Sequence, residues 1–330
     1  MFKIDHLLVL PRLYIQNANI ISSPMTWGFP AMSAFVGFMH ALERKLPDDI
    51  GLVFNEIGVV CHRIEPQVTT DAFVKGFHLT RNPVDKSGKT SAIVEEGRAH
   101  LSISLLIGVE AAEGSDDLRL EERRQQLADQ IHELVQGMRI AGGSVLPSTE
   151  QKSKRSRPKL VSFDSDDHEK RTYAWRVLKR QLLPGFALVL RDDALQQHTA
   201  ALKLEKSSST ALDAWLDLSR LNHECQRVSV ETDDGDTRER IEWTVHRPFG
   251  GWLVPIPVGY GAISPLYGPG EVDKARDNST SFQFVETLHS IGEWVSPHRI
   301  KDPSQLLWFV ENELDRGIYR LNNTYSDALN

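Results

Sequence analysis

Cysteine is scarce in this chain of 330 residues, which contains only Cys61 and Cys225. Two cysteines so far apart do not make a disulfide framework, and the sequence has no Cys-x-x-Cys pair for a structural zinc site. His62 follows Cys61 directly and His223 stands close before Cys225, and both pairs are spaced more tightly than common zinc ligands. We therefore expect no bound metal and a reducing, cytoplasmic setting.

Long apolar runs and a surplus of positive charge are also missing. The apolar run before Pro11 is too short for a signal-peptide core, and no run approaches the roughly 18 apolar residues that a membrane helix needs. Lys and Arg number 38 against 45 Asp and Glu, a net charge of −7, so any surface for an anionic partner must be local. Hydrophobic residues make up 40% of the chain, enough to bury a core. We expect a soluble protein with no membrane contact.

Complete motifs for catalysis or cofactor binding are missing as well. Gly88-Lys89-Thr90 resembles the end of a phosphate-binding loop, but Pro83 stands where that loop needs its first glycine. Neither His-Glu-x-x-His nor Gly-x-Ser-x-Gly occurs. We expect no cofactor and no catalytic residue. Metal-free RNA cleavage needs only a histidine, tyrosine or lysine near a 2′-hydroxyl, so a metal-independent endoribonuclease is the alternative.

Residues 1–150 contain one ordered alternation of strand and helix patterns. Phe35, Met39 and Leu42 share one helical face, with Ser33 as the expected cap. The order strand, helix, strand, strand, helix, strand predicts an α+β protein with a ferredoxin-like, RRM-like βαββαβ core. The predicted elements are strand 4–16, helix 33–46, strand 52–68, strand 100–109, helix 116–137 and strand 138–146, with 69–99 as an inserted loop.

The remainder divides into two further segments. Residues 151–245 are expected to be an inserted linker and helical thumb segment, with a helix over 171–182 and a later hairpin. Residues 246–330 are expected to form a C-terminal β/α region that packs back on the core. There we expect an irregular stretch at 252–263 and a helix over 304–320. From Lys152 to Arg180 the chain carries ten Lys or Arg and four Asp or Glu, a local charge of +6 that would suit an anionic partner or a solvated segment.

Two long and unusual blocks carry a resemblance to a known family. The first runs LPRLYIQNANIISSPMTWGFP over 10–30, and the second runs GWLVPIPVGYGAISPLYGPGEV over 251–272, followed by GEWVSPHR over 292–299. In order and spacing along nearly the whole chain, the sequence resembles the family of the second protein of the Csy complex, the type I-F CRISPR surveillance complex. Neither block is a general nucleotide or metal motif.

The resemblance implies a non-catalytic subunit of antiviral defence with a modified ferredoxin-like fold and an inserted thumb, near 69–99 or 150–245. Such proteins pair with the large subunit as a heterodimer and hold the 5′ handle of the CRISPR RNA. They lie next to the site where the protospacer-adjacent motif of target DNA is examined, and they abut the adjacent backbone subunit. RNA processing and DNA cutting belong to other proteins. A purely structural adaptor that touches only protein is a further reading.

Candidate RNA-binding residues lie mainly in the turn-rich parts of the two blocks. RNA-recognition modules stack bases on aromatics of their first and third strands. Tyr14 fits the first strand, but His100 and its neighbours give the third strand no aromatic residue, so loops and flanking cations should bind the RNA. The same amides and aromatics also suit turn and core positions. The residues nominated for RNA binding are Arg12, Asn17, Asn19, Ser22, Ser23, Trp27, Arg247, Tyr260 and Arg276.

Overall fold

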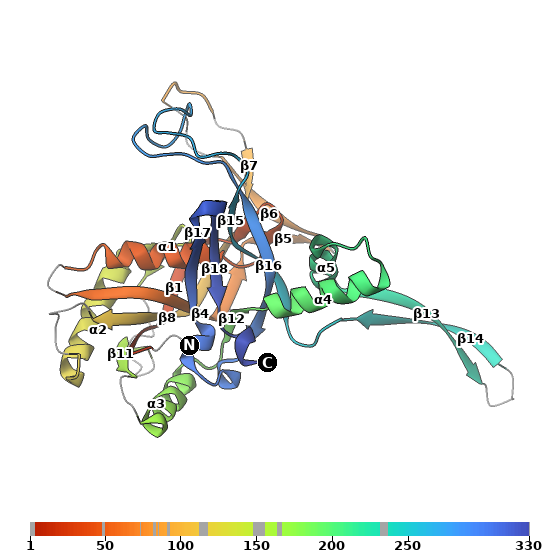
Figure 1. The fold of residues 1–330 in the computed structure, drawn as a ribbon, viewed down its shortest axis with the longest axis horizontal. Helices are drawn as coiled ribbons and strands as arrows, with labels where there is room; N and C mark the ends of the chain where they lie inside the picture. The colour runs from red at the N-terminus through yellow and green to blue at the C-terminus, as the bar shows by residue number, and fades with distance from the viewer. Residues whose placement is uncertain are drawn as a thin grey trace.

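The computed structural model describes residues 4–47, 50–72, 74–81, 84, 86–90, 93–111, 118–147, 156–163, 167–231 and 237–329. A large antiparallel sheet forms the body, helices lie on both of its sides, and two parts project from it (Figure 1). This mixed architecture agrees with the expected α+β class. The helices are α1 (Met32–Glu43), α2 (Glu121–Gln136), α3 (His168–Gln181), α4 (Asp192–Glu205) and α5 (Ala211–Leu218).

The strands divide into the large sheet and three small ones. Those of the large sheet are β1 (His6–Asn19), β4 (Leu52–Pro66), β8 (Arg98–Ala111), β9 (Arg139–Ile140), β10 (Gly143–Leu146), β11 (Lys159–Ser162), β12 (Phe186–Leu190), β15 (Leu253–Ala262), β16 (Val285–Val295), β17 (Trp308–Glu313) and β18 (Ile318–Asn323). The small sheets contain β2 (Ile21–Ser23), β3 (Thr26–Trp27), β5 (Val68–Asp71), β6 (Val74–Arg81), β7 (Ile93–Glu96), β13 (Asn222–Glu231) and β14 (Thr237–His246).

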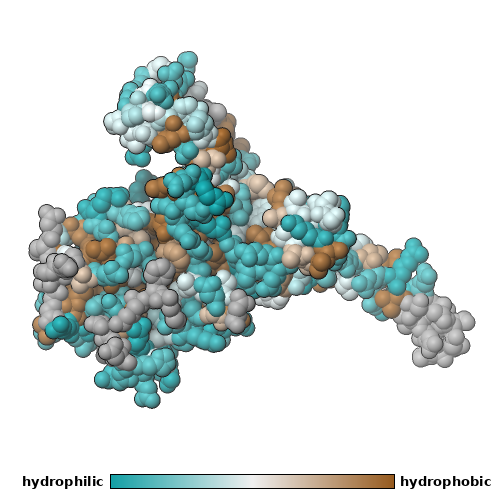
Figure 2. All heavy atoms as spheres, viewed as in Figure 1, coloured by the Kyte–Doolittle hydropathy of each residue, from teal (hydrophilic) through white to brown (hydrophobic). Residues whose placement is uncertain are grey.

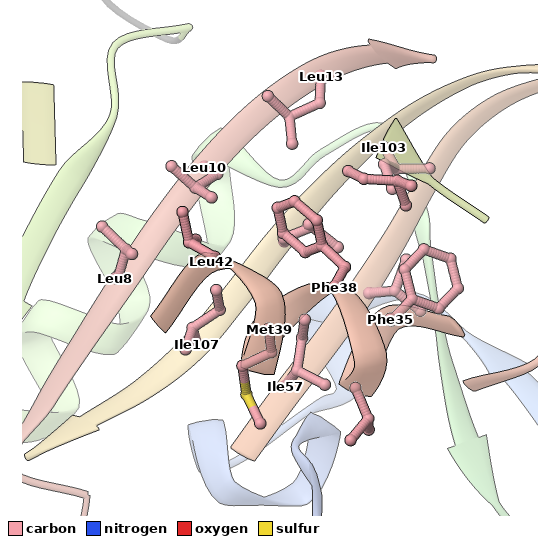
Figure 3. Packing of buried hydrophobic residues seen from close by; sticks show 14 of the residues in the cluster. Leu8, Leu10, Leu13, Phe35, Phe38, Met39, Leu42, Ile57, Ile103 and Ile107 are labelled. Atoms are coloured by element: carbon pink, nitrogen blue, oxygen red, sulfur yellow. The ribbon is translucent and has the colours of Figure 1, made fainter. Parts of the chain in front are cut away.

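The first part of the chain builds one end of the large sheet, where β10, β1, β8 and β4 lie side by side and every neighbouring pair is antiparallel. Helix α1 packs across these strands. Figure 3 shows Phe38 and Met39 of α1 among Leu10, Ile57 and Ile107 of β1, β4 and β8. Burying one such side chain contributes about 1.5–3 kcal/mol, so packing holds this helix on the sheet.

Packing also decides where α1 begins. The expected cap, Ser33, is wrong: the residue in the capping position is Ala31, and no side chain caps the helix. Met32, the first helical residue, is 1% exposed and belongs to the core. The helix therefore starts at the point where its apolar face meets the sheet.

Strand β4 is shared by the end of the sheet formed with β8 and by a closed ring of strands. One of its edges pairs with β8, while the other pairs with β17 at Ile57 and with β12 at Val60 and Cys61. Since β12, β16, β15, β18 and β17 pair in turn, the hydrogen bonds return to β4 and close a ring of strands. Trp308 is fully buried, and its indole Nε1 donates to the carbonyl oxygen of Leu188 at 2.8 Å, which ties β17 to β12.

The face of β1 that points away from α1 is covered over only part of its length. Leu7 and Val9 pack in a second core with Trp175 of α3, and β11 pairs with the same end of β1. Beyond Arg12 the cover ends, and Tyr14 is 37% exposed. The expected alternation along β1 is confirmed, because Leu13 is buried on the α1 side.

Two parts project from the body. The ribbon β13–β14 extends as an arm beyond α4 and α5 (Figure 1). Ile241, Trp243 and Val245 lie on one side of β14 and are 62%, 67% and 48% exposed, and hydrophobic residues show along the arm in Figure 2. The other projection contains β6 and β7 together with the loop between β15 and β16.

The helix expected over 304–320 is wrong. Strands β17 and β18 occupy this stretch and form a hairpin. The spacing of Leu306, Val310 and Leu314 suits a helix, but Gly317, at a φ of +63°, adopts the left-handed conformation that turns the chain back. Pairing of β18 with β15 and of β17 with β4 outweighs the helical pattern.

Two other expectations need correction or refinement, and two elements were missed. Within 69–99, expected to be a loop, the chain forms β5, β6 and β7, which pair in order. Residues 252–263 were expected to be more irregular than a simple strand; they form strand β15, and the irregularity is confined to a bulge between Pro257 and Gly259. Helix α4 and strand β16 were not foreseen.

The expected segment boundaries at 150 and 245 stay a prediction, although β11 and β12, which both come from the middle segment, hydrogen-bond into the large sheet.

Much of the basic run from Lys152 to Arg180 falls in α3, and its residues 152–155 lie outside the described residues. None of the helices in the described ranges is long and apolar enough to cross a membrane.

Candidate nucleic-acid interface

The uncovered end of the sheet holds a depression of about 550 Å³, which we call the sheet-face hollow. Arg12 and Tyr14 of β1, Arg63 of β4 and His100 of β8 line it. The ring centroids of Tyr14 and His100 are 6.1 Å apart. Cationic side chains beside flat rings are the chemistry with which proteins hold a single nucleic-acid strand.

Arg12 reaches the hollow from a bulge in β1. The register of β1 against β8 shifts between Leu10 and Leu13, and Arg12 has a φ of +55°. Its backbone N–H donates to Ser104 Oγ at 3.1 Å, and its Nη2 donates to the carbonyl oxygen of Leu183 at 3.1 Å. Arg12 thus holds the loop between α3 and β12 while it lines the hollow.

His62, which also lines the hollow, extends the hydrogen bonding from Ser104 to Pro184. Its Nδ1 lies 2.7 Å from the carbonyl oxygen of Pro184, which can only accept, so Nδ1 carries the proton. Its Nε2, 2.7 Å from Ser104 Oγ, then accepts the serine proton. Burial lowers the pKa of His62 to about 4, and the charge of Arg12 acts in the same direction, while the bond to Pro184 opposes both. His62 is therefore neutral at pH 7, with both ring nitrogens occupied.

Asn17 lies at the edge of the hollow, also with a positive φ, of +59°. Its backbone N–H donates to His100 Nδ1 at 3.4 Å, and its side-chain oxygen accepts from Gln67 Nε2. Arg98 Nη1 donates to the Asn17 carbonyl oxygen at 3.4 Å. These contacts fix the end of β1 beside the hollow.

Three nominated residues, Asn19 at the end of β1 and Ser22 and Ser23 of β2, form hydrogen bonds within or next to the β2–β3 hairpin. Asn19 Oδ1 accepts from the backbone two residues on, and Ser22 Oγ lies 2.8 Å from Thr26 Oγ1. Ser23 is buried, and its Oγ lies 2.7 Å from Thr26 Oγ1 and 3.0 Å from His289 Nε2. Ser23 therefore ties the hairpin to β16 and offers no open surface.

A second depression, of about 390 Å³, is walled by large aromatic side chains, and we call it the aromatic cavity. The rings come from Trp27 of β3, Phe29 in the following loop, Phe186 of β12, Trp252 just before β15, and Trp294 of β16. Phe186 and Trp252 meet edge to face at 5.7 Å, and Phe29 and Trp294 do so at 4.8 Å. The five rings thus converge from distant parts of the chain.

The two depressions meet at one short piece of β4, because His62 and Arg63 line both of them. Cys61, the preceding residue, lines the aromatic cavity. Burial raises the pKa of the Cys61 thiol to about 11, so it stays protonated and unreactive at neutral pH. The result is two depressions that share His62 and Arg63, one lined by Arg12, Arg63 and Glu65 beside two rings, and the other lined mainly by aromatic side chains.

The other nominated residues lie elsewhere. Tyr260 joins Asn19 and Ser22 in a third depression, of about 680 Å³. Arg247 follows the β14 arm and Arg276 lies in the loop between β15 and β16, and both are exposed outside the depressions described above. The structure thus places Trp27 and Ser22 in one cavity and Arg12 in the sheet-face hollow, and leaves Arg247 and Arg276 apart from both.

Sequence reasoning missed several residues of this surface: His62, Arg63, Phe186, Trp252 and Trp294 were not nominated. Trp252 stands inside the second unusual block and Trp294 inside the stretch 292–299 that follows it, so the signal was present. For Phe186 and Arg63 only the three-dimensional pairing of β12 with β4 reveals the role. Within the described ranges, no group of three His, Cys, Asp or Glu residues is placed to hold a metal ion.

Comparison with known proteins identifies the class. The family model described as "CRISPR-associated protein (Cas_Csy2)" matches residues 8–321, so the chain is a CRISPR-associated protein. A relative named "CRISPR-associated protein Csy2", from Pseudomonas aeruginosa (strain UCBPP-PA14), is 48% identical over 318 residues, which cover 96% of this chain and 94% of the relative. The chain therefore belongs to the Csy2 family, whose members are subunits of the type I-F Csy complex. The resemblance drawn from the two sequence blocks is confirmed.

Proposed function

We propose that this subunit is a non-catalytic RNA-binding protein that holds the 5′ handle of the CRISPR RNA across the sheet-face hollow. The observation that carries the proposal is that His62 and Arg63 line both the hollow and the aromatic cavity, so that cationic and aromatic groups lie next to each other. Membership of a CRISPR-associated family makes the CRISPR RNA the natural single strand for such a surface.

The residues of the hollow have complementary tasks in this proposal. Arg12 and Arg63 bind phosphates, and the rings of Tyr14 and His100 offer stacking faces, so in this proposal the strand lies on the sheet face and not in the loops that the sequence led us to expect. The side chain of Arg63 is 74% exposed and pairs with Glu65, so it can exchange that partner for a phosphate at little cost. The net charge of −7 is compatible, because one short strand needs only a local cationic strip.

The proposal includes the assembly partners implied by the family: the large subunit as a heterodimer, the adjacent backbone subunit, and target DNA near the protospacer-adjacent motif, in the cytoplasm. The exposed apolar side of the β13–β14 arm, with Trp243, supports contact with other protein. We assign the thumb to this arm, which lies within 151–245 and projects from the body (Figure 1).

We also propose that the part of the chain up to β10 is a ferredoxin-like unit. The strand order β10, β1, β8, β4 supports this, since it places the first and third strands of the βαββαβ sequence at the centre and leaves all neighbours antiparallel. Helices α1 and α2 occupy the two crossover positions in the chain.

The test is co-expression with the large subunit and the CRISPR RNA, followed by binding of the 5′-handle RNA measured by fluorescence anisotropy. We expect a stable complex, and we expect the double variant Tyr14→Ala, Arg63→Ala to bind the handle at least tenfold more weakly. Arg316→Ala, which removes an exposed arginine outside both depressions, is the matched control and should bind normally. An RNA-loaded complex that assembles without this chain overturns the proposal. Equal binding by all variants would show that the sheet-face hollow does not hold the handle and would overturn the proposal as well.

A further inference from the structure

We propose that the aromatic cavity is a nucleobase pocket, which receives one base that is unstacked from the RNA strand lying in the sheet-face hollow. This inference rests on the proposed function and specifies where one nucleotide of the bound strand goes. The ligand class is thus a base of single-stranded RNA, presented next to a phosphate at Arg63.

The first argument is the incomplete burial of the cavity rings. Trp27, Phe186 and Trp252 are 54%, 44% and 57% exposed, although each already touches another ring or the cavity wall. Large aromatic side chains gathered with open faces form an apolar surface that water solvates poorly. A flat aromatic ligand would cover these faces and gain stacking on every side.

The second argument is the shortage of hydrogen-bonding groups in the cavity wall. Pro255 and Pro257 of β15 line it and have no N–H to donate, and Ser22 Oγ is already bonded to Thr26. Cys61 presents a protonated thiol. The cavity can therefore recognise the face of a ring far better than the polar edge of a base. We expect a preference for purines over pyrimidines that follows ring area.

The third argument decides between a nucleobase and an apolar side chain of a protein partner. The cavity opens beside Arg63, whose side chain reaches solvent and also lines the sheet-face hollow with Arg12 and Tyr14. A base bound in the cavity brings its negatively charged phosphate close to Arg63, whereas an apolar protein side chain carries no charge for Arg63 to bind. Continuity between the depressions thus favours the nucleic acid.

The test uses the heterodimer with the large subunit and a series of 5′-handle RNAs, each with a single abasic nucleotide. Binding is measured by fluorescence anisotropy. We expect one position, or one adjacent pair, at which loss of the base weakens binding about tenfold, against small effects elsewhere. With Trp252→Ala, intact RNA should bind about tenfold more weakly, and all RNAs of the abasic series should bind this variant with similar affinity.

Two variants keep the result interpretable. Trp252→Phe retains a stacking face, so the handle position at which an abasic nucleotide weakens binding should reappear. This recovery would separate a loss of stacking from a loss of folding. Tyr173→Ala removes an exposed aromatic side chain of α3 that lines neither depression, and should leave the abasic pattern unchanged.

The outcomes separate this inference from the proposed function. If wild-type heterodimer binds the handle but every abasic position costs the same, the nucleobase pocket is wrong and handle binding stands. If the handle does not bind at all, both are wrong. A Trp252→Ala variant that loses the large subunit while keeping the abasic pattern would show that the cavity seats a protein side chain instead.

Discussion

The imidazole of His62 donates its Nδ1 proton to the carbonyl oxygen of Pro184 at 2.7 Å, and so joins β4 to a loop 122 residues further along the chain. The same ring accepts a proton from Ser104 through Nε2. This bond exists only while the imidazole is neutral at Nε2, so the contact makes the fold sensitive to acid.

We expect the free energy of unfolding to fall as the pH drops from about 6.5 to about 4. The folded state holds the pKa of His62 at about 4, below the ordinary histidine value of 6.5, so in this window the unfolded chain binds a proton that the native chain does not. The loss should be on the order of 1–3 kcal/mol. His62→Asn, which keeps a donor for Pro184, should flatten this slope in urea titrations across the window. His40→Asn, at an exposed position of α1, is the control, and an equal slope in His62→Asn contradicts the assignment.

Trp308→Phe should destabilise the protein by about 1–3 kcal/mol, because the buried carbonyl oxygen of Leu188 loses its indole donor and the smaller ring leaves a void. Chemical denaturation monitored by circular dichroism measures the change. Trp243→Phe, on the exposed side of the arm, should change the stability by less than about 0.5 kcal/mol. Similar effects at both positions would mean that Trp308 does not tie the ring of strands together.

Two glycines should respond to alanine with opposite signs. Gly259 has a φ of +152°, and a Cβ there would lie 2.0 Å from the carbonyl oxygen of Tyr319, so Gly259→Ala should cost about 2–4 kcal/mol. Gly37 lies inside α1 with open space around it, so Gly37→Ala should add about 0.5–1 kcal/mol. Thermal unfolding of the two variants checks both signs, and a tolerated alanine at 259 contradicts the tight approach of β15 to β18.

Arg63→Ala should change how handle binding responds to salt. Loss of one phosphate contact to a single strand lowers the slope of log K against log salt by about 0.7. Binding isotherms at several salt concentrations give the slope, and Arg316→Ala should leave it unchanged. A weaker affinity with an unaltered slope would place Arg63 away from the phosphates.

Purified protein incubated with repeat RNA in EDTA should leave the RNA intact. His62 has both ring nitrogens occupied and is neutral, and Cys61 is a protonated thiol, so neither group is suited to acid–base catalysis. Denaturing gels over long incubations provide the measurement. Cleavage that disappears on changing one histidine or tyrosine would support the endoribonuclease alternative.

Local periodicity predicted much of the first half of the fold. The apolar faces of α1 and α2 and the alternation along β1 and β8 are strong local patterns, and the elements form close to where they were expected. The pattern over 304–320 failed because its apolar spacing suits both a helix and a hairpin, and only pairing with distant β15 and β4 selects the hairpin. The prolines of β15 hid a strand that carries a bulge.

The site was predicted only in part for a related reason. Arg12 and Tyr14 could be found from the pattern of one strand. The junction of the hollow with the aromatic cavity depends on β12 reaching β4, a pairing of Phe186 with Cys61 that no local signal announces. Trp27, Trp252 and Trp294 come together only through the closed ring of strands.

The shared position of β4 has a consequence for how the protein can be divided. A truncation after residue 150 would remove β12 and β17 and leave the β4 edge from Ile57 to Cys61 without hydrogen-bond partners. Such an apolar unpaired edge is a template for aggregation. The front and rear portions of the chain should therefore melt as a single cooperative unit, and excised fragments should precipitate when expressed alone but become soluble when the missing piece is supplied in trans.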